Sequence, residues 1–118
     1  MRINVTARHF KLSEDLRNHA ENEVHRLKRY YEGIIDVDIV LGWEKKDRIA
    51  EINIRVNGTV LTARERSDDM IKSINNAVDK LERQIKRYKG KVYGFEHEKI
   101  GIEPEVTEEV SQNYDEDV

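Results

Sequence analysis

Basic residues recur along the stretch INNAVDKLERQIKRYKGK, residues 74–91, at spacings that would place them on one side of an α-helix. At about 100° per residue, apolar side chains such as Leu81 and Ile85 fall on the other side. The predicted outer side carries Lys72, Lys80, Arg83, Lys86 and Arg87, with Lys89 and Lys91 following. Each residue of an α-helix advances about 1.5 Å along the helix axis, so cations on one side of a helix can contact successive phosphates. The chemistry that they suggest is electrostatic binding of a polyanion.

These cations also have a simpler explanation. The outer face of a surface helix is usually charged only because it is solvated, and cations near a helix C-terminus suit the helix dipole. The distribution of charge along the chain favours the binding hypothesis. Residues 1–94 contain 20 Lys and Arg against 15 Asp and Glu, whereas residues 95–118 contain 1 against 9. The formal net charge of −3 therefore comes from an acidic tail and hides a basic body.

Other residues that could do chemistry form weaker patterns. Glu21 and His25 stand four apart on a predicted helix and could hold a metal ion, but no further ligand is near in the sequence. Asp36 and Asp38 share a strand face without a second cluster, so we interpret them as solvated. The sequence contains no nucleophile elbow, phosphate-binding glycine loop or metalloprotease motif, and it has no cysteine for a disulfide or thiolate zinc site. We therefore expect a protein that is not an enzyme and needs no metal or cofactor.

The elements that would position the cations follow from hydrophobic periodicity. Alternation predicts strands at residues 2–8, 35–43, 50–56 and about 59–65. A first helix should begin at Ser13 and end at Gly33, and a second should run over about 68–90 and end at Gly90. Asn57-Gly58 predicts a hairpin turn. The order β-α-β-β-β-α predicts an α+β fold, with a four-stranded sheet covered on one face by two helices.

Residues 1–94 are expected to form one domain, and residues 95–118 an acidic disordered tail or linker, because this segment holds the only proline and nine acids. Periodicity places Tyr31 and Trp43 in the core or at its edge, and a base-stacking role for Trp43 is the alternative. No apolar run approaches the length of a membrane span, and the N-terminus does not resemble a signal peptide. We therefore predict a cytoplasmic protein.

The run VNGTVLTARERSDDMIKSINNAVDKLERQIKRYKGK, residues 56–91, resembles the ribosome hibernation promoting factors, also called ribosome-associated translation inhibitors. RINVTARHFKLSEDLRNH and VDIVLGWEKK fit the same pattern, so the similarity covers about residues 1–92. The resemblance implies the same fold. It also implies binding to rRNA of the small ribosomal subunit, in the mRNA and tRNA channel, and inhibition of translation under stress or in stationary phase.

The resemblance further implies that the RNA-binding residues lie on the basic helix faces. The matching positions are Lys80, Arg83, Arg87, Lys86, Lys89, Lys91 and Lys28, with less direct matches at Arg29, Arg17 and Arg8. We expect Lys80 and Arg83 to point to water, so that reversing both charges would abolish ribosome binding and leave the fold intact. The chain departs from the family pattern at Ile71, Ser73 and Asn75, outside the basic arc.

Several alternatives remain open at this point. The chain looks like the short form of the family, or like the N-terminal part of a long form that also has a ribosome-dimerising domain. Two helices on a sheet also describe a double-stranded RNA-binding module, although its characteristic loop is not evident. A third possibility is a protein-interaction domain, able to dimerise, without RNA affinity. The salt dependence of binding and its specificity for ribosomes would separate these functions.

Overall fold

The computed structural model describes residues 1–98, with side chains through Gly90. Its elements, in chain order, are β1 (Arg2–Arg8), α1 (Glu14–Leu27), β2 (Asp36–Glu44), β3 (Asp47–Val56), β4 (Thr59–Ser67) and α2 (Met70–Glu98). The predicted order β-α-β-β-β-α and the α+β class are confirmed. The predicted tail, residues 95–118, lies almost entirely outside the described residues, apart from the last turn of α2.

The four strands form one mixed sheet in the spatial order β1-β2-β3-β4. β1 is parallel to β2, and the connection between these strands contains α1. β2, β3 and β4 pair antiparallel through two short hairpins. The turn at Asn57-Gly58 is where the sequence predicts it, and Gly58 has φ +87°, which glycine adopts without strain. The other turn consists of Lys45 and Lys46, between Glu44 and Asp47.

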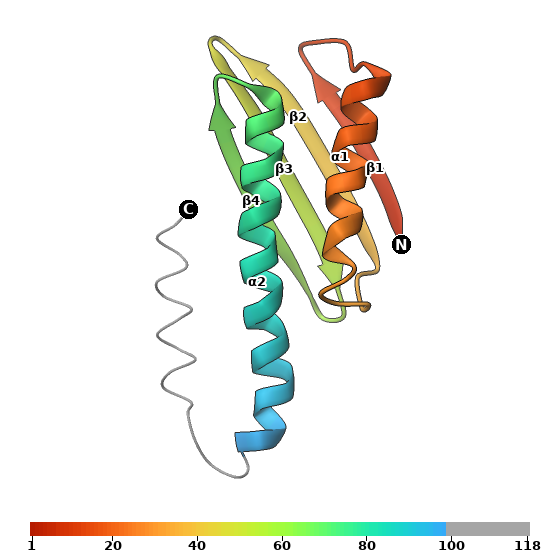
Figure 1. Cartoon of the computed structure of the whole chain (residues 1–118), viewed down its shortest axis with the longest axis vertical. Helices are drawn as coiled ribbons and strands as arrows, with labels where there is room; N and C mark the ends of the chain where they lie inside the picture. Colours follow the sequence, from red (N-terminus) through yellow and green to blue (C-terminus); the bar gives the residue numbers. More distant parts are fainter. Residues whose placement is uncertain (99–118) are drawn as a thin grey trace.

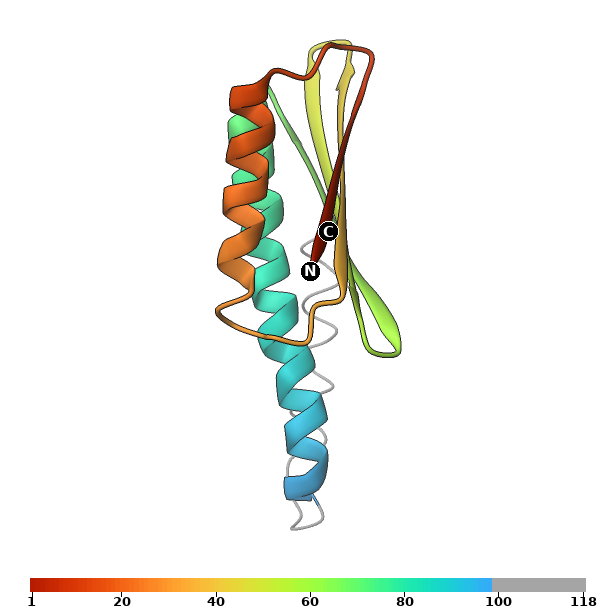
Figure 2. The ribbon, with the colours of Figure 1, turned by 90° about the vertical axis from the view of Figure 1, so that its right-hand side faces the viewer.

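Both helices cover the same face of the sheet, as Figure 2 shows. Alternate residues of the central strands face them and are fully buried, among them Ile39, Ile52 and Ile54. Leu27 of α1 and Leu81 of α2 complete this core from the helix side. The apolar residues that recur periodically in the strands and helices therefore pack together in one layer between the sheet and the helices, as the sequence pattern predicts.

The helix starts follow the predicted capping chemistry, whereas the helix ends do not. Ser13 Oγ accepts a hydrogen bond from the backbone N–H of Leu16 at 3.1 Å. α1 then ends at Leu27, six residues before Gly33, because the chain must turn there to reach β2. A Cβ on Gly33 would lie 2.5 Å from the Tyr31 ring, so this glycine makes room for that ring. α2 continues through Gly90 to Glu98, so the prediction that Gly90 ends it is wrong.

Trp43 is 43% exposed and does not pack against the core cluster, which corrects the prediction that it lies in the core or at its edge. It has the same strand parity as the buried Leu41, but it stands at the end of β2, where the hairpin projects past the start of α2 (Figure 1). Its ring stacks on Phe10 with centroids 5.0 Å apart, and the guanidinium carbon of Arg48 lies 4.2 Å from the ring centroid. Tyr31 is half-buried and packs against the core, as predicted.

Neither α1 nor the described length of α2 is both long and apolar enough to cross a membrane.

Candidate nucleic-acid interface

The two helices run in the same direction, side by side, so the C-terminal end of α1 and the loop that follows it lie beside the middle of the longer α2 (Figure 1). Two contacts join them at this end. Lys89 Nζ donates a hydrogen bond to the backbone carbonyl of Tyr30 at 2.6 Å, and Lys86 Nζ lies 5.2 Å from the centroid of the Tyr30 ring. Nearer the start of α2, His19 Nε2 lies 2.9 Å from Asn75 Oδ1. The parallel arrangement therefore gathers cations that are about 55 to 60 positions apart in the sequence.

We call this group of cations the basic surface. Its members are Lys28 and Arg29 after α1, and Arg83, Lys86, Arg87 and Lys89 on α2. Arg83 is exposed and makes no ion pair with any side chain that the structure describes. Lys86 is 59% exposed and lies 3.3 Å from Glu82 one turn earlier, a contact that solvent weakens. Positive charge on this surface is therefore available to an external anion.

Lys80 does not belong to the basic surface, contrary to the prediction. It is only 8% exposed, and its Nζ lies 2.7 Å from Oε2 of Glu65 on β4. The helical projection places Lys80 at the edge of the basic arc, and α2 packs on β3 and β4, so the strand covers that edge. The Glu65 carboxylate pairs with the buried ammonium and offsets part of the cost of burying it. The expectation that Lys80 points to water is wrong.

Of the remaining predicted residues, Arg87, Lys28, Lys89 and Arg29 belong to the basic surface. Arg87, Lys28 and Lys89 are half-buried, and the backbone N–H of Lys28 caps the C-terminus of α1. Arg29 and Arg17 are exposed, with Arg17 near the start of α1. The Lys91 side chain lies outside the described residues. Arg8 lies on the sheet face that the helices leave open, and it therefore cannot join the basic surface.

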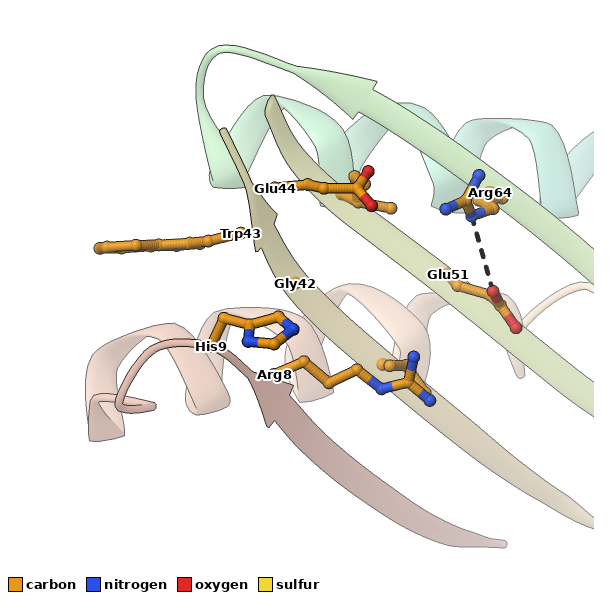
Figure 3. A pocket seen from close by; sticks show the side chains of 9 residues that line it. Arg8, His9, Gly42, Trp43, Glu44, Glu51 and Arg64 are labelled. Atoms are coloured by element: carbon orange, nitrogen blue, oxygen red, sulfur yellow. Dashed lines mark ion pairs between the residues drawn. The ribbon is translucent and has the colours of Figure 1, made fainter. Parts of the chain in front are cut away.

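The open sheet face neutralises most of its own charge. Cross-strand ion pairs join Arg55 to Asp36 (2.7 Å), Arg66 to Asp47 (3.0 Å) and Arg64 to Glu51 (3.7 Å). A hollow of about 100 Å³ lies on this face, and Arg8 at the end of β1 and Arg64 on β4 are among the residues that line it (Figure 3). It is smaller than the roughly 300–1,000 Å³ typical of ligand sites. Because its cations lie next to acids, this face is a weaker candidate for polyanion binding.

Three tyrosines near the ends of the helices were not assigned to a site by sequence reasoning. Tyr31 and Tyr88 pack edge to face with centroids 5.5 Å apart. A hydrogen bond to the Tyr88 hydroxyl, together with burial, raises the pKa of Tyr31 above its ordinary value of 10.0. Tyr88 Oη in turn donates to the backbone carbonyl of Asn57 at 3.1 Å. The available signal in the sequence was that Tyr31 and Tyr88 each stand next to several cations. That the two rings form one pair is visible only when the fold is known.

The metal hypothesis for Glu21 and His25 finds no support in the described part of the chain, where no three ligand-type side chains converge. His25 is exposed and Glu21 half-buried on α1. The chemistry available around the helix ends is therefore charge, hydrogen bonding and aromatic stacking.

Known proteins match this chain in sequence and in fold. Residues 3–93 match the family model described as "Sigma 54 modulation protein / S30EA ribosomal protein". A ribosome hibernation promoting factor from Salmonella typhimurium is 34% identical over 92 residues, covering 78% of this chain and 97% of the relative. A ribosome hibernation promotion factor from Bacillus subtilis is 28% identical over 95 residues, covering 78% of this chain and 50% of the relative.

Among solved structures, a ribosomal subunit interface protein from Coxiella burnetii superposes with a TM-score of 0.73 at 31% identity. The superposition covers 77% of this chain and 100% of that chain. These names refer to ribosome hibernation and subunit interfaces, and none refers to a catalysed reaction. The prediction that the protein is not an enzyme is therefore confirmed at the level of the family.

Proposed function

We propose, from the premise that this chain belongs to the Sigma 54 modulation protein / S30EA ribosomal protein family, that it is a ribosome hibernation factor. In this proposal it acts in the cytoplasm under stress or in stationary phase. It binds rRNA of the small ribosomal subunit in the mRNA and tRNA channel and inhibits translation. The names of its relatives support the hibernation role.

The observation that carries the RNA-binding part is the basic surface. Arg29, just after α1, and Arg83, on α2, are exposed cations, and Lys86 on α2 is a third. The open sheet face provides a contrast within the same molecule, because its arginines are paired with acids across the strands. A polyphosphate chain would therefore gain more from the helix side, where few counter-charges must be displaced.

The proposed mechanism is occupancy. A folded body held in the channel by phosphate contacts would exclude messenger and tRNA by its volume, and no bond would be made or broken. The predicted absence of a cofactor follows from this mechanism. Affinity that depends on counterion release should fall as the salt concentration rises, by roughly 10³–10⁵ between 50 and 200 mM if six to ten phosphates are neutralised.

The function is tested by reversing two exposed charges of the basic surface, Arg83→Glu and Lys86→Glu, and measuring cosedimentation with small subunits. Like charges placed against phosphates cost several kcal/mol, so affinity should fall by roughly 100-fold or more. The plot of log affinity against log salt should also become less steep by roughly two. Unchanged binding by this double variant would contradict the assignment of the surface.

The matched control is Lys45→Glu with Lys46→Glu, which changes the net charge equally at the turn between β2 and β3, at the opposite end of the sheet from the C-terminal ends of the helices (Figure 1). This variant should keep most of the affinity.

Further binding measurements distinguish the proposed function from its alternatives. Equal binding to any RNA duplex would indicate a double-stranded RNA-binding module, and binding that ignores salt would indicate a protein-interaction domain. Displacement by messenger and initiator tRNA would support hibernation.

A further inference from the structure

After α1 the chain passes beside α2 on its way to β2 (Figure 2). A hollow of about 370 Å³ lies at this loop. It is lined by Arg29, Tyr30, Tyr31, Glu32 and Gly33 of this loop and by Lys89 of α2. Its volume falls within the roughly 300–1,000 Å³ of typical ligand sites. The hollow adjoins the basic surface, because Arg29 and Lys89 belong to both.

The walls of the hollow differ in how firmly they are held. Tyr31 lies close over Gly33 and packs edge to face on Tyr88, so its ring is held between the loop and α2. Lys89 is tied to the carbonyl of Tyr30, which joins the loop to α2. The Tyr30 ring is half-buried, and Lys86, a long and largely exposed side chain, approaches it only to 5.2 Å. The Tyr30 ring can therefore exchange this loose cation contact for another planar group.

Two cations beside two aromatic rings match the chemistry of one nucleotide. Unpaired bases stack on tyrosine rings, while arginine and lysine bind the phosphate. The Glu32 carboxylate could accept hydrogen bonds from exocyclic amino groups of a base. An acidic peptide would use the cations but would gain nothing specific from the rings. The combination therefore favours nucleic acid over an acidic protein.

We propose that this hollow receives one unpaired nucleotide of RNA, with its base against the Tyr30 ring and its phosphate held by Arg29 and Lys89. The proposal rests on the proposed function and adds a base contact to a surface that otherwise binds phosphates. Such a contact would select single-stranded segments over regular duplexes, because paired bases are not available to stack on a side chain.

The test compares Tyr30→Leu with Tyr30→Phe in ribosome cosedimentation and in binding of a short single-stranded RNA that contains 2-aminopurine. Leucine keeps apolar packing against the core but has no ring, whereas phenylalanine keeps the ring. We expect Tyr30→Leu to lower both affinities by roughly 5- to 100-fold and Tyr30→Phe to bind like the wild type. The salt dependence should not change, because neither substitution removes a charge. Wild-type protein should quench 2-aminopurine fluorescence by stacking, and Tyr30→Leu should quench it much less.

Each outcome decides something. If the wild type does not bind ribosomes, the proposed function fails. If the wild type binds ribosomes and Tyr30→Leu binds equally well, the nucleotide site is wrong while the function stands. If GMP or AMP competes for the site as strongly as the short RNA does, the site belongs to a free nucleotide, which also overturns the proposal. Urea denaturation of both variants, showing equal midpoints, excludes unfolding as the cause of lost binding.

Discussion

At the scale of single residues, neighbours in the fold decide what a charged side chain does. Lys80 and Arg83 are both cations of α2, one turn apart, yet one is buried against β4 and the other is exposed. The buried lysine is paired with Glu65, and removing one partner of such a pair leaves the other charge poorly solvated. Lys80 therefore holds α2 against the sheet, and the family-based RNA contact is not part of our proposal.

Replacing Lys80 by methionine tests this role, because methionine keeps the apolar stem and removes the charge. We expect a loss of about 1–3 kcal/mol in the free energy of unfolding by urea, less than for a fully buried pair because Glu65 is partly exposed. Adding Glu65→Gln should recover much of the loss and leave ribosome binding near the wild-type level. If Lys80→Met abolishes ribosome binding at unchanged stability, the lysine turns outward on the ribosome and our correction is wrong.

At the scale of elements, the molecule depends on where the helices end and what joins them there. The connection from Lys28 to Ile35 ties α1 to β2, and Tyr31, Tyr88 and Asn57 link this connection to α2 and to the β3–β4 turn. A hydrogen bond that Tyr31 donates stabilises its neutral form, which is why its pKa is raised. This chain of hydrogen bonds should therefore hold at neutral pH and weaken at alkaline pH.

The pH dependence of stability tests this chain. Because the folded pKa of Tyr31 is raised, its contribution is fully present below the unfolded value of about 10 and is lost as the pH rises through the folded pKa. The urea midpoint of the wild type should therefore drop above about pH 10, and it should drop less for Tyr31→Phe. Tyr88→Phe removes the acceptor and should behave in the same way. An equally steep drop in Tyr31→Phe would show that the hydrogen bond is not the cause.

At the scale of the whole molecule, charge is separated along the chain. The basic surface lies on the helix layer, whereas residues 95–118 contain nine acids and one lysine. Such an acidic segment could compete with RNA for the basic surface by simple attraction. Competition of this kind would reduce binding to arbitrary RNA more than binding to a specific site.

Deleting residues 99–118 tests the competition. Affinity for an arbitrary single-stranded RNA should rise at low salt, and the difference from the full chain should shrink at high salt because screening weakens the attraction. A full chain with the acids of this segment changed to their amides is the matched control and should behave like the deletion. If the affinity rises for neither variant, the acidic segment does not shield the basic surface from RNA.

The sequence alone determined the element order, the fold class and the core, because apolar period and turn chemistry are local properties. Ile39, Ile54, Leu81 and Ile85 were all assignable to the core from their spacing. The resemblance to the hibernation factors was also readable in the sequence, and the matches to the family model and to the curated relatives confirm it.

Only the tertiary structure decided which boundary residues are covered. Lys80 is buried because β4 lies beside its edge of α2, and Trp43 is exposed because no helix reaches the end of β2. Gly33 serves the Tyr31 ring instead of ending a helix, and Tyr30 meets Lys86 only because the two helices run parallel. These outcomes depend on contacts between residues far apart in the chain, and periodicity within one element carries no information about its neighbours.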